Sequence, residues 1–229
     1  MRILHLHCMQ DVTKPDAEAA SIAEASGIPI EALVSLRPFE TPVPLSVLNR
    51  VDAVIIGGSA WSVFEDIPHY AAFRKLLLEA RHWKLPMFGI CFGAQALAHV
   101  FGGKVMRDPS HAEYGSIEVW REAVEDDLFD GLPDRFHAQA WHHDRIVDLP
   151  HDAHAVAWSQ DDVLQAFAFP GESIWGVQFH PERTHLTFER LLETRTAPCA
   201  EHPIDKIRAS LVPTPKATAI LARFIRDAI

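Results

Sequence analysis

The sequence predicts an α/β fold in which a mainly parallel sheet carries some antiparallel additions. As far as about residue 103, short apolar runs alternate with longer stretches of helical spacing, and beyond that point strand-like segments follow one another. A chain of 229 residues, 48% of them hydrophobic and 23% charged, can build one core without disulfides or structural metals. We therefore expect a single domain over residues 1–229, with a core of about 1–185 and a helical C-terminal extension over 186–229.

The first half of the chain supplies the expected parallel strands and their helices. Short apolar runs, one of them β-branched and ending in two glycines, predict buried strands at residues 1–6, 32–36, 51–56 and 86–90. Stretches rich in alanine and glutamate, or with apolar residues at helical spacing, predict helices at 16–26, 68–82 and 94–101.

The second half is richer in strands. Apolar segments separated by turns predict strands at 116–120, 136–141, 155–158, 163–169 and 173–179. The last segment, from Thr187 to Ile229, is helical at both ends and contains four prolines in its middle part, Pro198, Pro203, Pro213 and Pro215.

Charge and composition exclude several classes of function. Lysine and arginine number 21 and aspartate and glutamate 31, so the formal net charge is −10. An acidic chain is a poor ligand for phosphate backbones and for anionic lipid, so we expect no nucleic-acid or membrane partner. The chain has no run of about 18 apolar residues and no signal-like segment, which predicts a cytoplasmic protein. The spacing of its three cysteines and 14 histidines matches no metal site, so we expect no metal and no cofactor.

The most informative stretch is Gly89-Ile90-Cys91-Phe92-Gly93, which lies between a predicted strand and a predicted helix. A nucleophile between two small residues is typical of a nucleophile elbow, here with cysteine in place of serine. The turn places the sulfur at the positive end of a helix, where a thiolate is stabilised. The N–H of Phe92 points to the same place and can donate to an oxyanion.

A thiolate nucleophile needs a base, and the base needs an orienting group. The segment from Gln178 to Glu182 supplies both, because the predicted strand ends in His180 and Pro181 stops the ladder. Two residues further along an extended segment, Glu182 lies on the same side as His180. Glu182 can accept a hydrogen bond from one imidazole nitrogen and leave the other for Cys91.

Together these two stretches resemble the signature of the class I glutamine amidotransferases, the triad family of glutaminases. The resemblance covers roughly residues 50–185, and the motifs occur in the family's order. Within the family the chain is similar to stand-alone members that resemble the glutaminase domain of GMP synthase, a similarity carried by residues 55–66 and 97–105. The resemblance implies a three-layer, flavodoxin-like sandwich.

The resemblance also implies roles for individual residues. Cys91 would attack the side-chain amide carbon of glutamine, His180 would pass the thiol proton to the departing ammonia, and Glu182 would orient the imidazole. The N–H groups of Gly58 and Phe92 would form the oxyanion hole. Contacts to the bound substrate would come from Gln95, Ala60, Trp141, His142 and His143.

Two positions depart from the family pattern. Ser59 stands where many relatives have proline, which would make the oxyanion loop less rigid. His143 stands where many have glycine, which would crowd the pocket or alter its preference. Both departures leave the catalytic residues intact, and they bear on the substrate rather than on the class of reaction.

We expect an amidohydrolase that converts glutamine to glutamate and ammonia through a cysteine thioester. One alternative is a γ-glutamyl peptidase or hydrolase, which uses the same triad but needs a more open leaving-group side. An alternative of another class is a catalytically silent binding or regulatory protein. The chain has no P-loop motif, so a synthetase or acceptor subunit would be a separate partner, and a homodimer through the C-terminal segment remains open.

Overall fold

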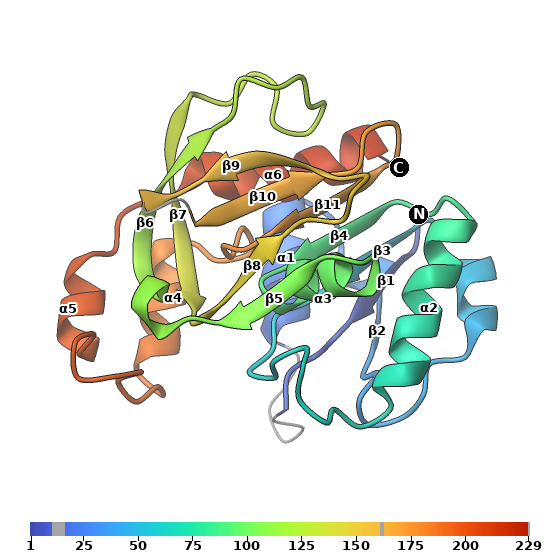
Figure 1. Cartoon of the computed structure of the whole chain (residues 1–229), viewed down its shortest axis with the longest axis horizontal. Coiled ribbons are helices and arrows are strands. Elements are labelled where there is room, and N and C mark those ends of the chain that lie inside the picture. The colour runs from blue at the N-terminus through green and yellow to red at the C-terminus, as the bar shows by residue number, and fades with distance from the viewer. Residues whose placement is uncertain (11–16, 161–162, 229) are drawn as a thin grey trace.

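The computed structural model describes residues 1–10, 17–160 and 163–228. Within this part of the chain, a nine-stranded sheet runs through the molecule in the order β2-β1-β3-β4-β11-β10-β9-β6-β7 (Figure 1). The first five strands in this order are parallel: β2 (Leu33–Leu36), β1 (Ile3–Leu6), β3 (Ala53–Ile56), β4 (Met87–Ile90) and β11 (Ile174–Val177). The other four are antiparallel: β10 (Leu164–Ala168), β9 (His154–Trp158), β6 (Glu113–Arg121) and β7 (Arg135–His142).

Helices cover both faces of the parallel part of the sheet. The side chains of a strand alternate between the two faces, so each strand contributes to two cores. On one face, Leu4, Val54 and Ile56 pack with α2 (Tyr70–His82) and α3 (Phe92–Val100). On the other face, Ile3, Ile55 and Phe88 pack with residues of α1 (Ala17–Ser26) and α6 (Pro215–Ala228). The result is a three-layer α/β sandwich, as the sequence predicted.

The structure also contains elements that the periodicity did not indicate. Strands β5 (Lys104–Arg107) and β8 (Asp144–Asp148) pair in a separate two-stranded antiparallel sheet. Short 3₁₀ turns lie at Ile30–Ala32, Leu45–Arg50 and Pro109–His111. The N-terminal helix begins at Ala17 in the described part of the chain, and Asp16, where the sequence predicted its start, lies outside the described residues.

The C-terminal segment forms three helices rather than helical ends alone: α4 (His185–Leu192), α5 (Ile204–Ala209) and α6. Phe188, Leu192 and Ile207 of α4 and α5 form a small separate cluster against Tyr114 and Trp141. Helix α6 instead belongs to the helical layer that it shares with α1, and its buried side chains Ile220, Leu221 and Phe224 pack on the sheet. Helix α6 is therefore part of the sandwich, whereas α4 and α5 are additions to it.

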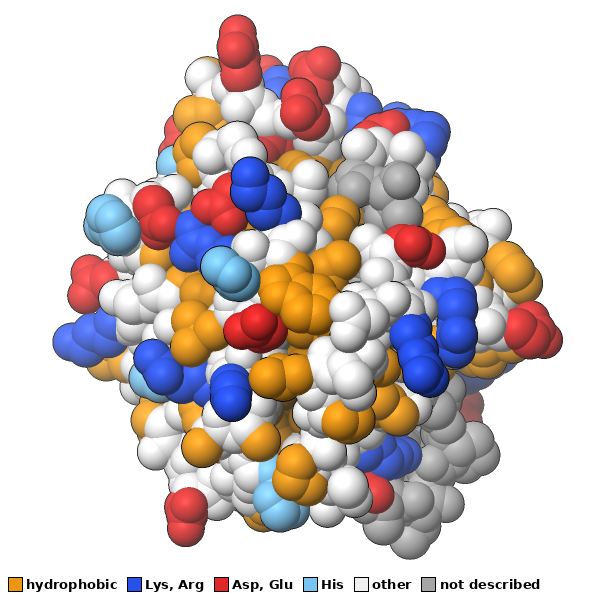
Figure 2. Space-filling view, turned by 90° about the vertical axis from the view of Figure 1, so that its right-hand side faces the viewer, with side chains coloured by type: hydrophobic (Ala, Val, Ile, Leu, Met, Phe, Trp, Pro, Cys, Tyr) orange, Lys and Arg blue, Asp and Glu red, His pale blue; other side chains and the backbone are white. Residues whose placement is uncertain are grey.

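The surface carries charges of both signs. On the face shown in Figure 2, acidic and basic side chains alternate and do not gather into one continuous block. None of the helices in the described ranges is long and apolar enough to cross a membrane.

Candidate active site

The site is built around the turn that joins β4 to α3. Strand β4 ends at Ile90 and α3 begins at Phe92, so Cys91 occupies the turn with φ 52° and ψ −105°. A positive φ is strained for a residue other than glycine, and such strain is characteristic of functional turns. The N–H of Cys91 donates to the carbonyl of Val177 at 2.8 Å, which ties the turn to the end of β11. The residue is 5% exposed and its side chain faces a cavity.

Glycine is required on both sides of this turn for steric reasons. A Cβ atom on Gly93 would lie 2.2 Å from the carbonyl oxygen of Ile56, and a Cβ on Gly89 would lie 2.6 Å from the carbonyl carbon of Gly93. The first turn of α3 thus packs directly against the backbone of β3 and β4. The two small residues of the sequence motif are the ones that permit this approach.

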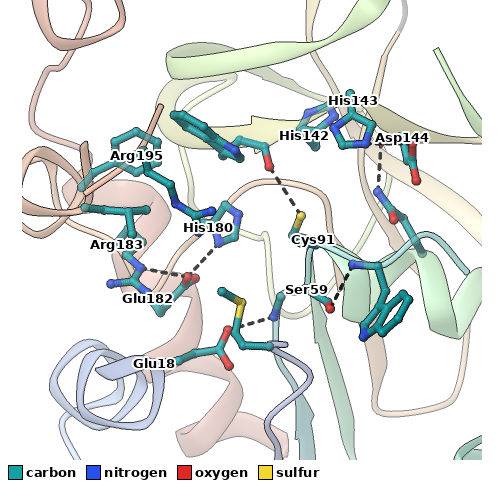
Figure 3. Close-up of a pocket in the computed structure, with 18 residues that line it drawn as sticks. Glu18, Ser59, Cys91, His142, His143, Asp144, His180, Glu182, Arg183 and Arg195 are labelled. Atoms are coloured by element: carbon teal, nitrogen blue, oxygen red, sulfur yellow. Dashed lines mark hydrogen bonds and ion pairs between the residues drawn. The ribbon is translucent and has the colours of Figure 1, made fainter. Parts of the chain in front are cut away.

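The residues predicted as base and orienting carboxylate, His180 and Glu182, lie just beyond the end of the neighbouring strand, β11. Strands β4 and β11 are parallel, with Ile90 beside Val177, so the chain segments that follow them emerge at the same edge of the sheet. His180 Nδ1 is 2.8 Å from Glu182 Oε1, and both side chains line the cavity that Cys91 faces (Figure 3). The Glu182 side chain is 1% exposed and also lies 3.4 Å from the Nε of Arg183.

This pair shifts both pKa values. Burial lowers the pKa of His180, but the charges of Glu182 and of the Cys91 thiolate outweigh burial and raise it to about 10. Burial raises the pKa of Glu182, but the charge of His180 and its hydrogen bond outweigh burial and lower the pKa. The geometry therefore favours an imidazolium beside a carboxylate, with the second ring nitrogen available to the cysteine.

A pH dependence of stability follows from these shifts. The raised pKa of His180 stabilises the folded state fully below its ordinary value of 6.5, and this stabilisation is lost as the pH rises towards about 10. The lowered pKa of Glu182 stabilises the fold above its ordinary value of 4.5 and is lost at lower pH. The difference in free energy of unfolding between the wild type and Glu182→Gln, measured by urea denaturation, should therefore be largest between pH 4.5 and pH 6.5. It should shrink as the pH rises towards about 10. A difference that stays constant from about pH 5 to pH 9 would contradict the assignment.

One glutamine and one carbonyl contact the sulfur of Cys91, and a second glutamine holds the first. Gln178 Nε2 lies 3.6 Å from Cys91 Sγ, and the carbonyl oxygen of Trp141 lies 3.9 Å from it. Gln95 Nε2 donates to Gln178 Oε1 at 3.1 Å and to the carbonyl of Asp144 at 3.0 Å. Gln95, predicted as a substrate contact, thus lines the cavity while its amide N–H groups hold Gln178 in place. The motif contained Gln178, but nothing in the sequence indicated that its side chain reaches the sulfur.

The loop that follows β3 contacts a further carboxylate in the site, that of Glu18 from α1. The N–H of Gly58, predicted as an oxyanion donor, donates to Glu18 Oε1 at 2.8 Å, and Glu18 Oε2 lies 3.1 Å from His5 Nε2. Glu18 comes from α1 and is only 5% exposed. A Cβ on Gly58 would lie 3.2 Å from His180 Cε1, so Gly58 borders the His180 side chain. The sequence could not indicate Glu18, because it is one glutamate in an ordinary Ala/Glu-rich helix.

Ser59, which was predicted to make this loop less rigid, forms two hydrogen bonds within the site. Its hydroxyl donates to the carbonyl of Cys8 at 2.6 Å and accepts from the N–H of Trp61 at 3.2 Å. These two bonds fix the loop where many relatives of the predicted family have proline. Cys8 itself is fully buried, and burial, followed by the nearby charge of Glu18, raises the pKa of its thiol.

The remaining predicted contacts all line the same cavity, which has a volume of about 130 Å³. Ala60 and Trp141 lie on its wall. His142 Nε2 is 2.9 Å from Glu113 Oε2 and its side chain is 2% exposed, so the imidazole ties β7 to β6. The His143 side chain is 43% exposed and lies 3.5 Å from Asp144 Oδ1. Within the described ranges, no three His, Cys, Asp or Glu side chains gather in a way that could hold a metal ion.

Comparison with known proteins matches the chain to one protein family. The family model for glutamine amidotransferase class-I matches residues 21–196. Glutamine-hydrolyzing GMP synthase of Thermosipho melanesiensis is 36% identical over 146 residues, which are 62% of this chain and 26% of that protein. A glutamine-hydrolyzing GMP synthase subunit from Saccharolobus solfataricus is 35% identical over 142 residues, or 62% of this chain and 73% of its own length. This chain thus spans about a quarter of the length of the first of these relatives.

Solved structures show the same fold at low sequence identity. A glutamine amidotransferase from Thermotoga maritima superposes with a TM-score of 0.76 at 22% identity, covering 98% of this chain and 96% of that one. One from Methylobacillus flagellatus gives 0.77 at 20% identity, covering 100% and 95%. Because the family model covers well over half of the residues, the chain belongs to the class I glutamine amidotransferase family.

Proposed function

We propose that this protein is a cysteine amidohydrolase that converts the side-chain amide of glutamine to glutamate and ammonia, with Cys91, His180 and Glu182 as its catalytic residues. The observation that carries the proposal is the 2.8 Å contact between His180 and Glu182 beside a cysteine in a strained strand-to-helix turn. Membership of the family supports the class of reaction.

The proposed reaction proceeds in two halves. The Cys91 thiolate attacks the amide carbon, and the C–N bond breaks as the His180 imidazolium gives its proton to the departing nitrogen, releasing ammonia. The product is a γ-glutamyl thioester on Cys91. His180 then takes a proton from water, which attacks the thioester, and the C–S bond breaks to release glutamate and restore the thiolate. Glu182 holds the imidazole and stabilises its charge in both halves.

The oxyanion of each half-reaction would be held by the N–H groups of Phe92 and Gly58. Phe92 is the first residue of α3, so its N–H is among those at a helix N-terminus that have no acceptor within the helix. The N–H of Gly58 instead donates to the Glu18 carboxylate. An oxyanion must therefore compete with the Glu18 carboxylate for this N–H donor. We expect Glu18 to lower the rate of the reaction for this reason.

Removing this carboxylate should speed the reaction. We expect Glu18→Ala to raise kcat for glutamine by about tenfold or more, since one oxyanion donor is worth about 10²–10³ in rate. The free energy of unfolding should fall by about 1–3 kcal/mol, because His5 loses a buried partner. The exposed Glu24→Ala on the same helix is the matched control and should change neither quantity. A lower kcat in Glu18→Ala would show that Glu18 assists the reaction.

A specific observation favours a second candidate, a γ-glutamyl peptidase or hydrolase. The catalytic cavity shares Met9, Glu18, Arg183, Leu191 and Arg195 with a second cavity of about 590 Å³ between α1 and α4. Because the second cavity adjoins the one that Cys91 faces, it offers space for a leaving group larger than ammonia. A γ-glutamyl amine or peptide would use the same triad and the same thioester.

One experiment distinguishes these functions. The purified protein is incubated with glutamine and, separately, with a γ-glutamyl dipeptide, and release of ammonia or of the free amine is measured. Ammonia alone supports the glutaminase, and faster release of the amine supports the peptidase. No turnover of either compound, with no alkylation of Cys91 by a glutamine-like electrophile, would support the silent binding protein. Because relatives include a component of GMP synthase, we further propose that ammonia can pass to a separate synthetase partner, which co-purification would identify.

A further inference from the structure

The second cavity, which lies between α1 and α4, is lined on one side by arginines. Arg183 lies between the two cavities, Arg195 follows α4 and lines both of them, and Arg190 of α4 lines the outer one. In Figure 3, Arg183 and Arg195 lie on the side of His180 that faces away from His142 and His143. Arg195 lines the same cavity as Cys91 and His180, so a leaving group that extends from Cys91 can reach its guanidinium.

Arg195 is a partly buried cation that pairs with no acidic side chain among the described residues. Its guanidinium forms no hydrogen bond or ion pair with another residue in the described ranges, and it stacks over the Trp141 ring at 5.7 Å from the centroid. Burial, followed by the charge of Arg183, lowers the pKa of Arg195. Partly buried charges in proteins are ordinarily paired, so a guanidinium left with only an aromatic face and a like charge suits an anion that comes from outside the protein.

Among the described residues, the cavity carboxylates Glu182, Glu18 and Glu24 do not satisfy this charge. Glu182 pairs with His180 and Arg183, and both oxygens of Glu18 are used by Gly58 and His5. Glu24 lines the outer cavity but is exposed to solvent. Arg183 is itself paired with Glu182 through its Nε and donates from Nη1 to the Ser21 hydroxyl at 3.5 Å.

We propose that Arg195 forms a subsite for a carboxylate on the leaving group, so that the substrate is a γ-glutamyl compound of an amino acid or short peptide. This inference rests on the proposed thioester chemistry and identifies the substrate class of the same site. The glutamyl part occupies the end near Gln95 and His143. The scissile amide lies at Cys91, and the carboxylate of the leaving amine lies against the planar guanidinium, which holds it through two parallel N–H donors.

The test compares two substrates that differ only in charge, γ-glutamylglycine and γ-glutamylglycinamide. The wild type should prefer the carboxylate in kcat/KM by about tenfold or more, the range expected of one charge-assisted contact. Arg195→Gln should bring the ratio of the two values close to one, and Arg195→Lys should restore part of it. Arg226→Gln, which removes an exposed arginine paired with Asp227 on α6, is the matched control and should keep the wild-type ratio.

Several outcomes would overturn the inference. A wild-type ratio near one would do so, and so would an equal loss on both substrates in Arg195→Gln, because the arginine would then act on the glutamyl part or on the fold. Turnover of glutamine but of neither glycine compound would overturn the subsite and leave the glutaminase standing. Failure of all three substrates, with no alkylation of Cys91, would overturn the proposed function itself.

Discussion

Replacing Cys91 by alanine should lower kcat for glutamine, or for the better γ-glutamyl substrate, by about 10⁴-fold or more, because removal of the nucleophile removes the covalent pathway. The backbone of the turn should tolerate alanine, which has the same Cβ as cysteine and meets the same positive φ. The variant should therefore unfold close to the wild-type urea midpoint. Any loss of activity can then be assigned to chemistry.

The matched control is Cys199→Ala, which removes an exposed thiol far along the chain from the elbow. Its kcat should equal that of the wild type. Retention of more than a tenth of the wild-type kcat in a folded Cys91→Ala would remove Cys91 from the mechanism. A comparable loss in Cys199→Ala would indicate that the assay depends on thiols in general.

Replacing Gly93 by alanine should give one of the largest stability losses in the molecule, about 3 kcal/mol in the free energy of unfolding. The added Cβ would lie 2.2 Å from the carbonyl oxygen of Ile56. The Cβ is bonded directly to the backbone of α3 and the oxygen belongs to the backbone of β3, so neither atom can rotate away. Either α3 must move from the sheet or β3 must shift. The measurement is urea denaturation monitored by circular dichroism, with the midpoint compared at constant m-value.

Gly171→Ala separates this steric effect from the ordinary effect of losing glycine. Gly171 has φ 75° and no atom within 4 Å of an added Cβ, so only the backbone conformation opposes alanine there. We expect a loss of about 1 kcal/mol in that variant. A Gly93→Ala protein as stable as Gly171→Ala would contradict the close contact between α3 and β3. A shifted α3 should also lower activity, since Cys91 and Phe92 move with it.

The sequence predicted the parallel strands, and it predicted that Cys91, His180 and Glu182 lie together, because the signals for these features are local. Val51 to Ile56 is a β-branched run whose burial on both faces follows from its composition, and the two glycines around Cys91 mark a turn that other residues cannot make. His180 and Glu182 are also close in the chain, but the expected extended segment was wrong: β11 ends at Val177, and a turn closed by the Arg183 N–H on the His180 carbonyl at 3.1 Å brings the two side chains to 2.8 Å. Each of these features depends on neighbours in the chain.

The features that the sequence did not predict depend on contacts between distant segments. Glu18 reaches Gly58 across 40 positions, and Gln178 reaches Cys91 across 87. Strands β5 and β8 are short and lie largely outside the main sheet, so their pairing left no long periodic signal. Arg195 follows a predicted helix as an ordinary basic residue, and only the packing of α4 beside the cavity leaves it without an acidic partner in the part of the chain that the structure describes.

The central claim, that Cys91 carries the γ-glutamyl group during turnover, can be tested by intact-protein mass spectrometry of protein quenched with acid during reaction with substrate. We expect a fraction of the wild type to gain the mass of one γ-glutamyl group, with the adduct on the peptide containing Cys91 and absent from Cys91→Ala. Turnover without any such adduct, or an adduct located on another residue, would contradict the account.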